Sequence, residues 1–398
     1  MEVKNSKSSK KNKKVATGSS LDEFTKAFDT LNNAAYYVGL NFQTLELDLN
    51  IRIFGSALFM IIIYVLCILT CWKLREDWQG LFETLVIIVL NIQGTNKIWI
   101  AVVHKPRYFR LFQTSQQIYE SFDADERNRP ILRDMVAKMI FFLKGMIVVY
   151  ATAGGAIIVF VFLYVAFTRQ KFMPISVHIP YVDHSSWIGY IITFVAHSLM
   201  IVYCCNGYLT SDTAFVATVV PIIGYANSFQ NEISNFNQLL TMPKRDEKLI
   251  EEKLARIRKL HQMIVDFELD AIEHYAGGCL VQISTQAGSV LLCIFLGYIC
   301  GYVQAISISM GLAFQITQYC ALGTIVTAKN EQITADIYDI GWNKLQKPQQ
   351  QMVAFMLHRA QIARDLTVGQ VAPLNMVTYV KIMKTMYSFF AMLVTVMR

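Results

Sequence analysis

Charge is scarce in this sequence: only 16% of its 398 residues are Asp, Glu, Lys or Arg, whereas 54% are hydrophobic. Soluble domains carry about 25% charged residues on average. The apolar residues also gather in long blocks separated by charged ones, a pattern typical of helices that cross a bilayer. The composition therefore argues against a soluble enzyme and predicts an all-α membrane protein.

Motifs that mark catalytic or metal chemistry are also lacking. The sequence has no P-loop, dinucleotide fingerprint or nucleophile elbow, and its histidines have no metal-ligand spacing. The eight cysteines form no CxxC pair and lie in or beside apolar blocks, so we interpret them as small buried side chains. We therefore expect no catalytic residue, no metal and no other cofactor, which disfavours a membrane enzyme.

No apolar stretch precedes Ile53, so the amino-terminal segment does not have the form of a cleavable signal peptide. Its first 20 residues are instead rich in Lys, Ser and Asn. The four lysines between positions 10 and 14 could attract nucleic acid or anionic lipid. We favour a solvated cytoplasmic tail and expect no nucleic-acid partner.

Seven crossings fit the hydropathy pattern. Residues 53–72 are uncharged and long enough for one crossing, and the uncharged block 275–328 is long enough for two, joined by a turn near Gly297 to Gly301. The last crossing starts near Met376 and carries two lysines in its first turns. The remaining three crossings cover about 81–103, where several polar residues suggest a face towards protein or water, 145–168 and 186–211.

The distribution of Lys and Arg predicts the orientation. With the amino terminus in the cytoplasm, 27 of the 36 basic residues lie in cytoplasmic segments and 5 in extracellular ones, as the positive-inside rule requires. Seven crossings then place the carboxyl terminus outside. A G-protein-coupled receptor has the opposite orientation, and the sequence has neither a DRY-type triplet nor NPxxY. An odd number of crossings without an internal repeat disfavours a transporter.

The seventh crossing has two different faces. Lys381, Thr385, Ser388, Met392 and Val396 follow steps of three or four residues and so share one side of the helix. If four copies met at an axis, the two hydroxyls would line a hydrated path and the last two side chains would close it by dewetting. In the alternative, the hydroxyls bond to carbonyls of their own helix and the methionine merely packs.

Four motifs after the sixth crossing occur in a telling order. Tyr338 and Trp342 come first, followed by the triplet Arg359-Ala360-Gln361, then Pro373-Leu374, then Tyr387-Ser388-Phe389-Phe390. Residues 258–398 thereby resemble the insect odorant receptor family. Gustatory receptors, the sister family, are the nearest alternative. Their carboxyl-terminal motif differs from Tyr387-Ser388-Phe389-Phe390, which favours the odorant family.

The resemblance implies an odorant-gated, non-selective cation channel with four subunits around one pore. It implies a tuning subunit that joins the odorant receptor co-receptor in a heterotetramer. The expected location is the lipid of the plasma membrane of a sensory neuron dendrite, and the expected ligand is a small volatile molecule. It also implies that Met392 lies in the gate region of the family. Together with the stripe described above, this makes Thr385, Ser388, Met392 and Val396 the expected pore and gate residues.

The family's odorant site lies in the outer half of the bundle, between crossings two, three, four and six. A volatile ligand needs a small, mostly apolar cavity with one or two polar anchors. Matched by depth, the expected ligand-binding residues are Phe82 and Leu85; Ile158, Phe162 and Tyr164; Tyr190, Phe194 and His197; and Tyr302, Ile306 and Met310.

These expectations divide the chain into six segments. They are a cytoplasmic amino-terminal segment (1–52), crossings one to four with the ligand pocket (53–240), a cytoplasmic helix (241–274), crossings five and six (275–328), cytoplasmic anchor helices (329–375) and a pore-lining helix (376–398).

Overall fold

The computed structural model describes residues 20–42, 44, 50–243, 245–301, 303–362 and 365–396, which are almost entirely helical. The helices are α1 (Ser20–Val38), α2 (Ile51–Lys73), α3 (Trp78–Val103), α4 (Lys105–Asp123), α5 (Arg129–Thr168), α6 (Trp187–Thr241), α7 (Glu247–Cys300), α8 (Val303–Tyr338), α9 (Lys347–Ala360) and α10 (Met376–Val396). Short elements between them are η1 (Glu126–Asn128), η2 (Trp342–Lys344) and the antiparallel pair β1 (Thr367–Val368) and β2 (Ala372–Pro373). The all-α membrane class is confirmed.

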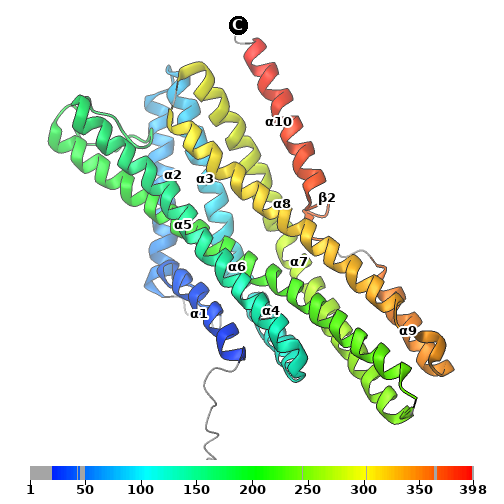
Figure 1. Cartoon of the computed structure of the whole chain (residues 1–398). Helices are drawn as coiled ribbons and strands as arrows, with labels where there is room; N and C mark the ends of the chain where they lie inside the picture. Colours follow the sequence, from blue (N-terminus) through cyan, green and yellow to red (C-terminus); the bar gives the residue numbers. More distant parts are fainter. Residues whose placement is uncertain are drawn as a thin grey trace, which may run out of the picture.

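Six described helical segments are long and apolar enough to cross a membrane: α2, α3, α6, α7 and the segments Glu126–Thr168 and Ala305–Lys344. The seventh expected crossing corresponds to α10, a 21-residue helix that falls outside this group of six and carries Lys381 and Lys384. Figure 1 shows α10 standing beside the bundle, with the carboxyl end of the helix at the top of the view.

The expected cytoplasmic helix and the fifth crossing form one continuous helix, the 54-residue α7. Asp246 caps its start by accepting hydrogen bonds from two backbone amides, and Gly301, in a left-handed conformation, ends it within the predicted turn. At 1.5 Å per residue, α7 is about 80 Å long, whereas a bilayer core is about 30 Å thick. Much of α7 must therefore project beyond the membrane.

The helix α1 was not expected from the sequence. Phe24, Phe28 and Leu31 form its buried stripe, and Phe24 stacks on Tyr119 of α4 with 4.6 Å between ring centroids. This part of the amino-terminal segment is therefore packed against the bundle. The lysines at positions 10 to 14 lie outside the described residues.

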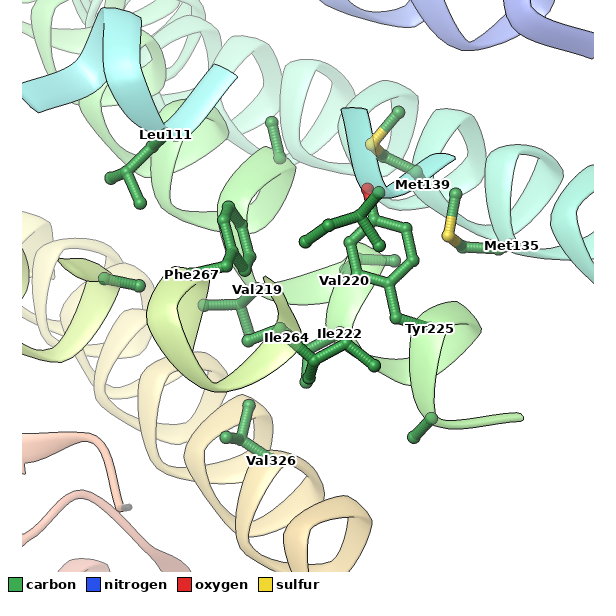
Figure 2. Packing of buried hydrophobic residues seen from close by; sticks show 14 of the residues in the cluster. Leu111, Met135, Met139, Val219, Val220, Ile222, Tyr225, Ile264, Phe267 and Val326 are labelled. Carbon is green, nitrogen blue, oxygen red and sulfur yellow. The ribbon is translucent and has the colours of Figure 1, made fainter. Parts of the chain in front are cut away.

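The main core lies where α4, α5, α6, α7 and α8 converge (Figure 2). Every residue from 212 to 222 of α6 is buried, so that stretch is covered by protein on all sides. All eight cysteines are free thiols, and four of them are buried. We call the end of the bundle that holds the segment 169–186 the loop end, and the opposite end, which holds α9, the α9 end.

Candidate functional site

The start of α10 is fixed to the bundle by the small hairpin β1–β2. The Gly369 amide donates to the Ala276 carbonyl of α7 at 2.9 Å, and the Met376 amide donates to the Thr324 hydroxyl of α8 at 2.9 Å. Gly323 lies so close to the Leu374 carbonyl oxygen that a Cβ at this position would come within 1.7 Å of it. The orientation of α10 is therefore set where the hairpin meets α7 and α8.

The stripe predicted to line a pore lies on the exposed side of α10. Met386 is buried against α7 and α8, whereas Thr385, Ser388, Met392 and Val396 are all exposed in the single chain. The two hydroxyls donate to carbonyls one turn earlier, at 2.9 and 3.1 Å, which leaves their oxygen lone pairs available. Lys381 and Thr385, at the start of the stripe, line a groove between α10, the hairpin and α7.

Three of the predicted pocket residues lie together at the loop end of α6. Tyr190 is buried beside α5, its hydroxyl donates to the Phe172 carbonyl at 3.0 Å, and Phe194 lies next to its ring. His197 is fully buried one turn further along, with Nε2 2.9 Å from the Val177 carbonyl oxygen. The segment 169–186 thus supplies backbone oxygens to both polar side chains.

Of the other predicted pocket residues, Tyr164 lies beside this cluster, with its ring centroid 5.2 Å from that of Phe172, which packs against Tyr190. The rest are not gathered around it. Phe82 packs towards α7, near Phe295, and Ile158 is half-buried on α5. Tyr164 donates to Gln170 at the end of α5. Tyr302 lies outside the described residues, and four more are exposed on the surface of the single chain: Leu85, Phe162, Ile306 and Met310.

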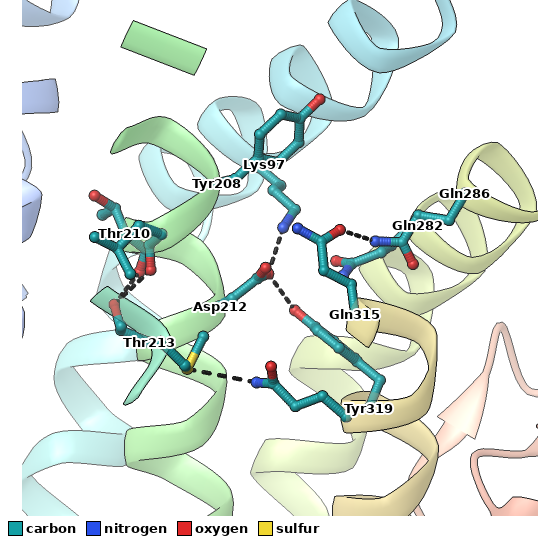
Figure 3. Close-up of polar contacts among 12 residues, drawn as sticks. Lys97, Tyr208, Thr210, Asp212, Thr213, Gln282, Gln286, Gln315 and Tyr319 are labelled. Carbon is teal, nitrogen blue, oxygen red and sulfur yellow. Dashed lines mark hydrogen bonds and ion pairs between the residues drawn. The ribbon is translucent and has the colours of Figure 1, made fainter. Parts of the chain in front are cut away.

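A buried ion pair that was not predicted lies deeper in the bundle (Figure 3). Lys97 of α3 pairs with Asp212 of α6, and both side chains are almost completely inaccessible to solvent. The Asp212 carboxylate also accepts hydrogen bonds from the hydroxyls of Tyr150 on α5 and Tyr319 on α8. Four helices therefore meet at one carboxylate, whose charge is neutralised by a lysine and stabilised by two phenols.

The same network continues into α7 through amide side chains. Gln315 of α8 donates to the Tyr150 hydroxyl and accepts from the Gln286 amide. Gln93 of α3 is fully buried, and both of its amide atoms lack a partner among the described residues. Buried polar groups are nearly always hydrogen-bonded, to water if not to protein.

The polar residues of the crossing at 81–103 were expected to face protein or water, whereas the crossing at 186–211 was expected to end one residue before Asp212. The available signal was the pair of opposite charges, since a charge within an apolar helix is expected to face the protein interior and to pair with another. Tyr150, Gln315 and Gln286 give no comparable signal, because Tyr and Gln also occur at many helix surfaces.

Known proteins with similar sequences are odorant receptors. The model of a family described as 7tm odorant receptor matches residues 77–387. Odorant receptor 83c of Drosophila melanogaster is 20% identical over 382 residues, which cover 92% of this chain and 95% of that protein. Odorant receptor 10 of Aedes albopictus is 22% identical over 333 residues, which cover 80% and 86%.

Solved structures share the fold. The olfactory receptor OR5 of Machilis hrabei in complex with eugenol superposes with a TM-score of 0.76, over 94% of this chain and 98% of that one, at 12% identity. A second solved structure of the same receptor superposes with a TM-score of 0.74. At this identity, the similarity establishes the fold and not the ligand.

Proposed function

Since this chain belongs to the odorant receptor family of seven-helix membrane proteins, we propose that it is a subunit of an odorant-gated cation channel. In this proposal a small volatile molecule binds in the bundle and opens a pore lined by α10. The family consists of receptors and channels, not enzymes. It is also the odorant family rather than the gustatory one that matches this chain.

The observation that carries the proposal is the exposed stripe of α10. A membrane helix that buries one side against its own bundle and exposes Thr385, Ser388, Met392 and Val396 on the other requires a further environment for that side. Around a shared axis the hydroxyls would contact water, and rings of Met392 and Val396 would form an apolar constriction. Lipid alone would not favour the lysine and hydroxyl side chains on the same stripe.

The odorant site proposed here centres on Tyr190, Phe194 and His197. Their rings and the half-buried Phe172 and Met173 give apolar surface, and two of them carry polar atoms that can orient a ligand. Opening requires that the ligand bind the open state more tightly than the closed one, since only differential affinity shifts such an equilibrium.

Assembly with the co-receptor is part of the same proposal. A groove of about 800 Å³ between α7, the hairpin and α10 is lined by apolar residues together with Lys381 and Thr385. This groove lies beside the α10 stripe, where neighbouring subunits of a tetramer would meet. The positive-inside orientation and the plasma membrane of a sensory neuron dendrite as location belong to this proposal as well.

Replacing Met392 or Val396 by alanine in the heteromer tests the pore assignment. Removal of an apolar ring should change ion selectivity or blocker sensitivity and raise the current recorded without odorant. Phe390→Ala is the matched control, because Phe390 packs against Tyr298 of α7 and does not belong to the stripe. Currents that are unchanged in both stripe variants would remove α10 from the pore.

A further inference from the structure

The segment 169–186 lies across the loop end and is bonded to three helices. The His178 amide donates to the Thr70 hydroxyl of α2 at 2.8 Å, and the Thr84 hydroxyl of α3 donates to the Ser176 carbonyl at 3.2 Å. Ile175 and Val177 are buried among residues of α2, α3 and α6. This segment is therefore a fitted cover over the ends of these helices.

A line of polar side chains joins this cover to α2 and α6. Lys73 Nζ, at the end of α2, lies 2.9 Å from His178 Nε2 and 3.4 Å from Nδ1. His178 Nδ1 lies 2.8 Å from His184 Nε2, and His184 Nδ1 lies 3.1 Å from the Thr193 hydroxyl of α6. Both imidazoles are half-buried.

The directions of the two bonds that join His178, His184 and Thr193 can be derived. The Thr193 hydroxyl donates to the Gly189 carbonyl at 2.9 Å, so it must accept from His184 Nδ1–H. His184 Nε2 then carries a lone pair and accepts from His178 Nδ1–H. The Lys73 ammonium group lies beside both ring nitrogens of His178 and is nearer to Nε2, which carries the lone pair. The arrangement is complete only when both imidazoles are neutral.

We propose that the line Lys73–His178–His184–Thr193 is a proton-sensitive latch, which holds the cover to α2 and α6 when both imidazoles are neutral and releases it in acid. A proton added to His178 Nε2 would make the imidazole a cation whose Nε2 lies 2.9 Å from the ammonium nitrogen of Lys73. A proton added to His184 Nε2 would point at His178 Nδ1–H. In either case an acceptor becomes a donor and an attractive contact becomes a repulsive one.

Burial and neighbouring charges favour the neutral form of His178. Burial, Lys73 and His184 together lower the pKa of His178 from its ordinary value of 6.5. Because the folded protein binds this proton less readily than the unfolded chain does, the latch contributes fully above pH 6.5. Its contribution is lost as the pH falls from 6.5 through the lowered pKa of His178.

Other ionisable groups pack against the cover from each side. Glu83 of α3 is engaged by the hydroxyl of Ser176, and the exposed Asp183 accepts from the Ser185 amide. Lys171 donates to the Ser185 carbonyl, and His197 of α6 bonds to the Val177 carbonyl. Both carboxylates accept hydrogen bonds within the cover, and the basic side chains of Lys171 and His197 lie near it.

The consequence for odorant response rests on the proposed function. The cover supplies the carbonyls that hold Tyr190 and His197, so release of the latch would loosen the proposed odorant site. Mild acid on the loop side should then weaken odorant potency without affecting the α10 pore itself.

Hydrogen–deuterium exchange of the purified full chain in lipid nanodiscs tests the latch directly. Exchange in the peptides that cover 172–185, corrected for the intrinsic pH dependence of exchange, should rise severalfold between about pH 7.5 and about pH 5.5. The double variant His178→Gln/His184→Gln keeps donors and acceptors but cannot titrate, so its corrected exchange should not change. His358→Gln, on an exposed site of α9, is the matched control and should behave as the wild type.

Two results would overturn the latch: exchange in the wild type that does not depend on pH, or the same pH dependence in the double variant. If the double variant does not fold, the single variant His184→Gln should retain only part of the response, and a full response would count against the latch.

Odorant-evoked currents provide the separate control. Exchange that responds to pH in a chain that never conducts would refute the proposed function alone, and normal currents with unresponsive exchange would refute the latch alone.

Discussion

The middle of α6 and its loop end differ sharply in their surroundings. Residues 212–222 are buried on every side by α4, α5, α7 and α8. Nearer the loop end, the same helix exposes Ile188, Ile191, Val195 and Leu199. One continuous helix is therefore a core element along part of its length and an apolar surface along the rest.

This difference indicates where each part obtains its stability. The part of α6 towards the α9 end is packed by the chain itself, as in a soluble helical bundle. The part towards the loop end exposes apolar side chains, which can contact lipid, neighbouring subunits or a ligand. We therefore expect substitutions in the buried half to unfold the protein, and substitutions in the loop half to change its interactions.

Loss of the buried ion pair should have the largest effect. Lys97→Met leaves Asp212 charged in a low-dielectric interior, and breaking such a pair costs roughly 3–5 kcal/mol. Thermal unfolding of the purified protein measures this change. Lys138→Met removes an exposed pair with Asp134 and should cost about 0.5 kcal/mol or less. Equal losses in the two variants would show that the buried pair is not special.

A core aromatic gives the next comparison. Phe215 of α6 is fully buried and stacks on Tyr319 with 4.2 Å between ring centroids, so Phe215→Ala should lower the free energy of unfolding by roughly 3–5 kcal/mol. Phe167→Ala, at an exposed position near the loop end of α5, should change it by about 0.5 kcal/mol or less. Similar melting temperatures for the two variants would contradict the contrast between the halves.

The smallest expected effect concerns the attachment of α10. Gly323→Ala places a methyl group against the Leu374 carbonyl, an overpacking that should cost about 1–3 kcal/mol and shift the hairpin that directs α10. Gly311→Ala, in the same helix with open space around it, should instead stabilise α8 by about 0.5–1 kcal/mol. Channel opening without odorant, recorded for both, should change only in the first variant.

Much of the architecture was predictable because the thickness of the bilayer sets the length of each crossing helix at about 20 residues. The uncharged block 275–328 had to fold back once, and Gly301 ends α7 within the predicted turn. The continuity of α7 was missed because a change from charged to apolar composition was taken as a boundary. No residue between His274 and Gly278 breaks a helix strongly enough to interrupt α7, so hydrogen bonding continues across the change in solvent.

The candidate sites were predictable only where one helix carries the whole pattern. The stripe on α10 follows from spacing within 21 residues, and the structure places it on the exposed side, although its contact with a pore stays a prediction. Pocket residues depend on the rotation of several helices about their axes. Phe162 and Met310 were chosen by depth alone, and both are exposed in the single chain.

By itself, the sequence determined the membrane class and the number of apolar blocks. Which charge meets which, and which face of each helix turns inward, was decided by the tertiary structure. Hydropathy is a property of short segments, whereas the meeting of Lys97 with Asp212 and the line from Lys73 to Thr193 depend on helices brought together from distant parts of the chain.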